Sequence, residues 1–299
     1  MRLAEEVLGC KNSLSDYPRI SEFLNEKRIL SISILDSVWR KENLLLKLSC
    51  LKGNYVFKQI NNDEKTGEME RVKILKSSYP QLVPDVHVFE DDAYLMDYVE
   101  GKGFFDLNKK EKIEKVGICG MLLKSAWKEK EFPRKDISEK IRASFNKYRL
   151  KGEKFFSEDE LRIDNFDVFK SVPDQISHND INAANLLYDK RIKLIDPSNE
   201  GYNDIARDIG RYCASTFFND YDRFGNDKKH SLDVAQAFLS NFKDFNPDTL
   251  ERARYFIGES FLSFLNFQTI TVPKSMLKSL AINVLTKKQP LMKSLEESL

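Results

Sequence analysis

Residues 177–196 read SHNDINAANLLYDKRIKLID, and this stretch does most to define the fold of the chain. Asp180 follows His178 by two positions, and Asn185 follows Asp180 by five. Two short apolar runs, LLY and RIKLI, come next and flank a polar turn, which predicts a β-hairpin. The second run ends at Asp196, so a loop that carries Asp180 and Asn185 precedes a hairpin that closes on another carboxylate.

The composition is typical of a soluble globular protein. The chain has 299 residues, of which 41% are hydrophobic and 32% charged, a length that suits two lobes. No apolar run approaches the ~20 residues of a membrane span, and the N-terminal sequence lacks the pattern of a secretory signal. We therefore expect a cytoplasmic protein with no membrane partner.

The charge balance argues against a nucleic-acid partner. Lys plus Arg number 48 and Asp plus Glu 47, so the net charge is +1 and offers no strong attraction for phosphate backbones or anionic lipid. The four cysteines have no CxxC spacing, which disfavours a zinc site or a dense disulfide framework. We expect reduced thiols that are mostly buried.

The first hundred residues are predicted to form a small antiparallel sheet with one helix. Residues 28–60 contain three apolar-rich segments with partial alternation, and Gly53 and Asn54 form a turn signal between the last two. Residues 64–78 have helical spacing and end near two prolines. Two further strands are predicted by VHVFE at 86–90 and AYLMDYV at 93–99.

Beyond Gly103 the apolar spacing becomes mainly helical. The pattern predicts an α+β fold of two lobes, with a β lobe at 1–100 and a helical lobe at 101–299. The pivot between them is expected at about 97–103.

This organisation suits phosphoryl transfer from a nucleotide. Such a reaction needs an Asp that orients and deprotonates the attacking hydroxyl, oxygen ligands for Mg²⁺, and a Lys on the phosphates. The catalytic loop of kinases has the pattern H-R-D-L-x-x-x-N, and residues 178–185 read HNDINAAN with the same spacing.

On these residues the chain resembles the aminoglycoside phosphotransferase and choline kinase-like family of small-molecule kinases, which have a protein-kinase-like fold. The resemblance covers about residues 28–213. It implies that Asp180 is the catalytic base, that Asn185 and Asp196 bind Mg²⁺, and that His178 supports the loop.

Residues 194–210, LIDPSNEGYNDIARDIG, match a later segment of the same family. Asp204 and Asp208 correspond to its two carboxylates. By resemblance Asp208 buttresses the catalytic loop from the next helix, and we expect Asp204 to brace the loop as well.

The nucleotide-binding residues are expected in the first lobe. Lys58 in YVFKQ lies on the third predicted strand, like the Lys of the kinase pattern V-A-I-K. A Glu of the following helix should pair with it. Glu68 is favoured because Val72 and Leu75 follow it on the same helix face, and Glu70 is the alternative.

The run YLMDYVEG resembles the hinge of these kinases. The resemblance implies that main-chain groups of Asp97 and Val99 bind the adenine edge and that Met96 lies behind the base. Between the first two strands the chain reads LDSVWRKEN without a glycine, so phosphate contacts there would have to come from Ser37, Arg40 or the backbone.

The predicted activity is transfer of the ATP γ-phosphoryl group to a hydroxyl of a small molecule, with Mg²⁺ as cofactor. Aminoglycosides, choline or ethanolamine, sugars and amino alcohols are candidate acceptors. Acids near 158–167 and at Asp220 and Asp222 could favour a cationic acceptor, although acids are frequent throughout. The alternatives are a protein kinase, which the absence of an A-P-E segment disfavours, and a catalytically inactive nucleotide-binding module.

Overall fold

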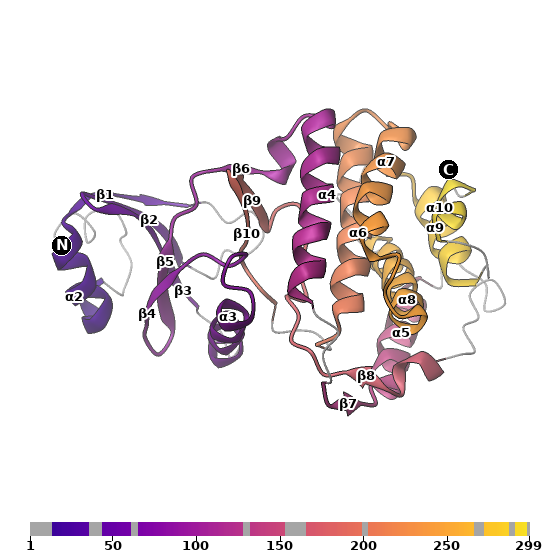
Figure 1. Ribbon diagram of the computed structural model, residues 1–299, viewed down its shortest axis with the longest axis horizontal. Coiled ribbons are helices and arrows are strands. Elements are labelled where there is room, and N and C mark those ends of the chain that lie inside the picture. Colours follow the sequence, from indigo (N-terminus) through magenta and orange to yellow (C-terminus); the bar gives the residue numbers. More distant parts are fainter. Residues whose placement is uncertain are drawn as a thin grey trace. The chain divides into compact units, whose positions relative to one another are not determined.

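The computed structural model describes residues 14–35, 44–60, 65–127, 132–152, 166–198, 203–265, 272–286 and 291–297 (Figure 1). The chain divides into two compact units. The first comprises Met1–Gly101 with Leu187–Asn199, and the second comprises Lys102–Leu186 with Glu200–Leu299. A mixed α and β fold with an antiparallel sheet is therefore confirmed.

The first unit contains a five-stranded antiparallel sheet with strand order β1-β2-β3-β5-β4. The strands are β1 (Ile29–Ile34), β2 (Leu44–Cys50), β3 (Gly53–Gln59), β4 (Val86–Phe89) and β5 (Ala93–Asp97). Gly53 begins β3 with a φ of 126°, a conformation that favours glycine and lets β2 turn directly into β3. All five strands were predicted from the sequence.

Helices cover both faces of this sheet. Helix α2 (Pro18–Lys27) and the 3-10 turn η1 (Leu14–Asp16) pack on a core that includes Leu46, Phe57 and Leu95. Helix α3 (Lys65–Ser78), which the sequence predicted, packs on the opposite face through Met69 and Val72. The sequence did not predict α2.

A β-hairpin in the first unit is formed by β9 (Leu186–Asp189) and β10 (Arg191–Leu194). Lys190 turns the chain between them with a φ of 55°. The amide of Leu194 donates to the carbonyl oxygen of Leu82 at 2.7 Å, which fixes the end of β10 against the segment that follows α3. The predicted hairpin is thus confirmed.

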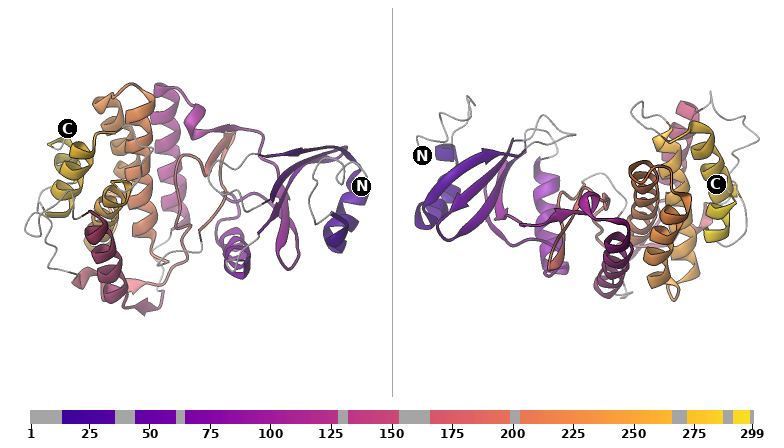
Figure 2. Two further views of the ribbon diagram at one scale, coloured as in Figure 1. Left: turned by 180° about the vertical axis from the view of Figure 1, so that it is seen from behind. Right: turned by 90° about the horizontal axis from the view of Figure 1, so that it is seen from above.

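The second unit is mainly helical. Its helices are α4 (Lys109–Ala126), α5 (Ser138–Gly152), α6 (Ile205–Arg223), α7 (Lys228–Leu239), α8 (Pro247–Phe264), α9 (Lys274–Thr286) and α10 (Leu291–Glu296). Its short elements are β6 (Lys102–Gly103), β7 (Arg134–Lys135), β8 (Val172–Pro173), η2 (Phe104–Asp106), η3 (Asp167–Phe169) and η4 (Ser240–Phe242). Helix α6 contacts both α7 and α8, and Figure 2 shows the helices of this unit from two further sides.

The close contact between α6 and α8 depends on Gly210. A Cβ at this position would lie 2.6 Å from the Cβ of Phe256 and 2.7 Å from the carbonyl oxygen of Ala253. Real Cβ atoms do not approach other atoms so closely, so only glycine lets α8 pack at this distance. The first turns of α6 are therefore held firmly against the helical core.

A charged pair is buried between α4 and α6. Lys112 forms an ion pair with Asp220, and both side chains are inaccessible to solvent. Nε2 of His230 on α7 lies 3.6 Å from the other carboxylate oxygen of Asp220. Burial lowers the pKa of Lys112 and raises that of Asp220, with the ion pair opposing both shifts. Asp220 is therefore not an exposed acid that could meet a cationic acceptor.

The described cysteines are Cys50, Cys119 and Cys213, and all are buried free thiols, as expected. Burial raises the pKa of Cys213 to about 12, so the thiol stays protonated at neutral pH. Among the described residues, no helix combines the length and the apolar character needed to cross a membrane.

Candidate active site

Lys58 is a buried cation on β3 of the first unit. The register places it opposite Tyr94 of β5, so its side chain shares the face of the sheet that α3 covers. Its Nζ lies 2.7 Å from Oε1 of Glu68 and 2.5 Å from Oδ1 of Asp196. A strand, a helix and the segment after the hairpin thus converge on one ammonium group.

The two carboxylates keep Lys58 charged despite its burial. Only 4% of the residue is exposed, and burial alone would disfavour the ammonium form. Asp196 and then Glu68 outweigh this effect, so the pKa of Lys58 is raised above its ordinary value. Glu68 is itself buried and accepts a hydrogen bond of 2.9 Å from the Tyr94 hydroxyl. Glu70, the alternative partner, is exposed.

Asp196 differs from Glu68 in its access to solvent. Its side chain is 41% exposed, whereas that of Glu68 is 2% exposed. Its backbone has a φ of 57°, in the left-handed region that non-glycine residues seldom adopt and that is often found at functional sites. Asp196 can therefore bind the Lys58 ammonium and still present carboxylate oxygen to a ligand.

The HNDINAAN loop lies in the second unit and is held by the first turn of α6. One oxygen of Asp208 accepts from the His178 amide at 2.7 Å, and the other from the Asn179 amide at 2.6 Å. Asp208 is fully buried, and Asn179 has a φ of 64°. Hydrogen bonds to an ionised carboxylate are strong, so they can offset the cost of this backbone conformation.

Asp180 follows directly and is fixed at both carboxylate oxygens. Nδ2 of Asn185 donates to Oδ2 of Asp180 at 3.1 Å and to its carbonyl oxygen at 2.9 Å. Nη2 of Arg211 on α6 donates to Oδ1 of Asp180 at 3.0 Å. The carboxylate remains 28% exposed, so it can still meet a bound molecule.

Two arginines of this region were not predicted from the sequence. Besides Arg211, the buried Arg252 of α8 donates through Nε to Asp204 at 2.8 Å. Asp204 is buried as well and accepts the Ala206 amide at the start of α6, which is a bracing position. Arg211 has a sequence signal, because it lies three residues after Asp208 and so on the same helix face.

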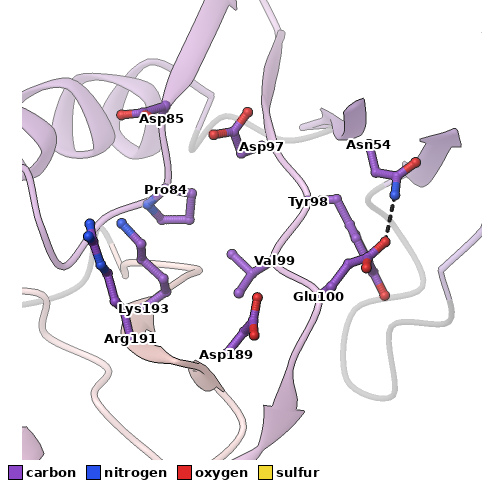
Figure 3. Close-up of a pocket in the computed structure, with 10 residues that line it drawn as sticks. All are labelled: Asn54, Pro84, Asp85, Asp97, Tyr98, Val99, Glu100, Asp189, Arg191 and Lys193. Atoms are coloured by element: carbon purple, nitrogen blue, oxygen red, sulfur yellow. Dashed lines mark hydrogen bonds between the residues drawn. The ribbon is translucent and has the colours of Figure 1, made fainter. Parts of the chain in front are cut away.

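The segment after β5 borders an open cavity of about 400 Å³ in the first unit (Figure 3). The Val99 side chain points into the cavity, opposite Lys193 of β10 (Figure 3). Most of the lining is charged: Asp85, Asp97, Glu100, Asp189, Arg191 and Lys193. Met96 does not line this cavity and instead packs on the α3 face with Tyr94.

The side chain of Asp97 points away from the Lys58 face. Its carboxylate lies 2.7 Å from Nε2 of His87, and its residue pairs with Tyr55, which belongs to the core under α2. The Tyr98 amide donates to the Asn54 carbonyl oxygen at 2.9 Å, which ties the segment to β3. Any contact of Asp97 on the Lys58 face would therefore be made by its main chain.

The predicted site residues thus form two groups. Lys58, Glu68 and Asp196 meet in the first unit, and His178, Asp180, Asn185 and Asp208 meet in the second. Among the described residues no cluster of three or more His, Cys, Asp or Glu could hold a metal ion by itself. Residues 36–43, which include the candidate phosphate contacts Ser37 and Arg40, lie outside the described residues, as do residues 158–165 and the Asp222 side chain.

The sequence matches no protein-family model, and no curated protein sequence matches it. Solved structures, however, resemble this chain over at least 90% of its length. A thermostable mutant of aminoglycoside phosphotransferase APH(4)-Ia, solved with ADP and hygromycin B, has a TM-score of 0.54 at 14% identity, covering 93% of this chain and 97% of that one.

Two further structures give a similar result. Macrolide 2'-phosphotransferase from Brachybacterium faecium has a TM-score of 0.52 at 11% identity over 90% of this chain and 98% of that one. Choline kinase from Streptococcus pneumoniae has a TM-score of 0.50 at 14% identity over 95% of this chain and all of that one. The expected likeness to aminoglycoside phosphotransferases and choline kinases is thus confirmed at the level of the fold.

Proposed function

We propose that this protein is an ATP-dependent phosphotransferase that moves the γ-phosphoryl group to a hydroxyl of a small molecule. The observation that carries the proposal is the buried Lys58 between Glu68 and Asp196. A cation held in this way is positioned for phosphate oxygens and cannot rotate freely into solvent. Fold alone does not assign chemistry, so the argument rests on these residues.

Lys58 binds the nucleotide phosphates in this proposal, and Glu68 orients its ammonium. The metal ligands are Asp196, through its exposed carboxylate, and Asn185, through Oδ1 of its carboxamide. Both donors are oxygens, which Mg²⁺ prefers, and Mg²⁺ commonly takes only one or two protein ligands beside phosphates and water. When bound, Mg²⁺ would neutralise charge on the phosphates.

Asp180 is the proposed general base. The acceptor oxygen attacks the γ-phosphorus, the bond to the bridging oxygen of the β-phosphate breaks, and ADP leaves. The hydroxyl proton passes to the Asp180 carboxylate. Asn185 and the loop support, His178 and Asp208, keep this carboxylate in place.

The base of the nucleotide is expected at the segment after β5. Main-chain groups of Asp97 and Val99 would bind the adenine edge, and Met96 would lie behind it on the Lys58 face. The nucleotide-binding lobe expected at residues 1–100 would then also include the hairpin segment 187–199, which belongs to the same unit. A hinge at about 97–103 would join it to a catalytic and acceptor-binding lobe formed by the rest of 101–299. The enzyme would work in the cytoplasm, where ATP is available.

The acceptor belongs to the small hydroxyl compounds, such as an aminoglycoside, choline or ethanolamine, a sugar or an amino alcohol. A protein substrate is disfavoured, because Asp204 follows Asp196 by only eight positions and leaves little room for a long peptide-docking loop.

An acceptor screen tests the proposal. Purified protein with ATP and Mg²⁺ is incubated with a panel of these compounds, and ADP release is measured beside mass spectrometry of the acceptor. We expect ADP release that depends on one acceptor class, with a mass gain of one phosphoryl group. Nucleotide binding without acceptor-dependent ADP release across the panel would instead support an inactive nucleotide-binding module.

A further inference from the structure

Helix α6 contributes two groups to the HNDINAAN loop, and only one of them was expected. Asp208 binds the loop backbone, and Arg211, three residues later on the same face, binds the Asp180 carboxylate. We propose that Arg211 is a positioning residue that orients Asp180 for its reaction with the acceptor. This inference rests on the proposed phosphotransferase function.

The geometry restricts Asp180 from two sides. Arg211 holds Oδ1 at 3.0 Å, and Asn185 holds Oδ2 at 3.1 Å. With Asn185 alone, the carboxylate could still turn about its Cβ–Cγ bond. A second donor on the other oxygen removes this freedom, and a guanidinium group is well suited to the task because its donors have a fixed planar geometry.

Helix α6 is a firm support for such a contact. Gly210, directly before Arg211, lies against Phe256 of α8 at a distance that no side chain would allow. The turn that carries Asp208 and Arg211 therefore cannot shift without disturbing the helical core. One rigid turn sets both the backbone of the loop and the direction of its carboxylate.

The contact is poorly suited to a purely structural role. The side chains of Arg211 and Asp180 are 36% and 28% exposed, and ion pairs of this exposure add little to stability. The nearby buried acid Glu259 does not depend mainly on Arg211. Burial raises its pKa, and Arg207, a hydrogen bond of 2.8 Å from Ser144 of α5 and, more weakly, Arg211 oppose this shift. Loss of Arg211 should therefore change the reaction more than the fold.

Steady-state kinetics of Arg211→Gln, Arg211→Lys and Arg223→Gln, with ATP and the acceptor found in the screen, test this inference. Arg223 is the matched control, because it lies on the same helix over the Phe224 ring. We expect Arg211→Gln to lower kcat by about 10- to 100-fold, the effect of a misplaced catalytic group, with the KM for ATP within about twofold. Arg211→Lys should restore part of kcat, and Arg223→Gln should match the wild type.

The possible outcomes separate this inference from the proposed function. Wild-type kcat in Arg211→Gln, or a change confined to the KM for ATP, would overturn the positioning role while the phosphotransferase function stood. Absence of any turnover in the wild type would overturn the function and this inference with it. If Arg211→Gln unfolds at a lower temperature than Arg223→Gln, Arg211→Lys is the deciding variant. The positioning role is then wrong if the kcat of Arg211→Lys does not lie between those of Arg211→Gln and the wild type.

Discussion

At the scale of single residues, Lys58 shows how neighbours decide the charge of a buried group. Burial disfavours its ammonium form, and the carboxylates of Asp196 and Glu68 reverse the balance, so the pKa is raised. A positioned cation stabilises the charge on phosphates during transfer, so its loss should affect turnover more than nucleotide affinity.

We expect Lys58→Ala to lower turnover at least ~100-fold, with a smaller loss of ATP affinity. Glu68→Ala should lower turnover as well, because Lys58 loses the carboxylate that directs it from α3. Glu70→Ala is the matched control on the exposed side of the same helix. The measurement is acceptor-dependent ADP release beside calorimetric ATP binding, and equal damage from Glu70→Ala and Glu68→Ala would refute the pairing role.

The sequence predicted the members of the loop from their spacing alone, because Asp180 and Asn185 lie within one short segment. The sequence places Arg211 on the same helix face as Asp208, but its contact with Asp180 could not be predicted from spacing. The contact joins residues 31 positions apart, and it exists only because α6 packs beside the loop. Local spacing predicts groups within one element, whereas contacts between elements depend on packing.

At the scale of elements, α3 was predicted from the sequence and α2 was not. Helix α2 does carry local signals, because Pro18 lies in its first turn and the buried Ile20 and Leu24 are four positions apart. Its N-cap residue Tyr17, however, makes no side-chain cap. The amides of Arg19 and Ile20 donate instead to Glu90 Oε1, at 2.6 and 3.3 Å, across some 70 positions of sequence.

The close packing of α6 on α8 predicts that a side chain at position 210 lowers the stability of the protein. Gly210→Ala should lower the free energy of unfolding by about 1–3 kcal/mol, because its Cβ would overlap Phe256 and backbone atoms of α8. Gly117→Ala on α4 is the control. Its Cβ would meet nothing closer than 3.9 Å, so the better helix propensity of Ala should leave stability unchanged or raise it by up to about 1 kcal/mol. Urea unfolding of both variants checks this, and equal effects would contradict the assigned packing.

The segment after β5, where the base of ATP is expected to bind, gives a second prediction at the scale of elements. Asp97→Ala should leave ATP affinity nearly unchanged, because its side chain points to His87 and only its main chain would contact the base. Met96→Trp should weaken ATP binding, because a larger side chain on the Lys58 face would shrink the space for the base. Calorimetric titration with ATP distinguishes the two. Loss of binding in a folded Asp97→Ala variant would mean that the base lies elsewhere.

At the scale of the whole molecule, the buried Lys112–Asp220 pair joins α4 to α6 inside the helical unit. A buried pair adds little by itself, but removing one partner leaves an uncompensated charge. We expect Lys112→Met to lower the free energy of unfolding by about 3–5 kcal/mol and Lys112→Met with Asp220→Leu to recover most of that loss.

Lys124→Met is the control for this change. Lys124 lies on the same helix and pairs with Asp244, whose side chain is 70% exposed. Its removal should cost no more than about 1 kcal/mol. Denaturant unfolding of the three variants is the measurement. Similar losses in the free energy of unfolding for Lys112→Met and Lys124→Met would show that the buried ion pair matters no more to stability than the exposed one.

The most direct test of the proposed function separates the roles of Asp180 and Asp196. Single-turnover transfer of the γ-phosphoryl group from ATP to the acceptor is measured for Asp180→Asn and Asp196→Asn, beside calorimetric ATP binding with and without Mg²⁺. Asp180→Asn should abolish transfer and retain Mg²⁺-dependent ATP binding, whereas Asp196→Asn should weaken both, because a hard cation loses a carboxylate ligand. Wild-type transfer in Asp180→Asn, or loss of the Mg²⁺ dependence in that variant and not in Asp196→Asn, would contradict the account.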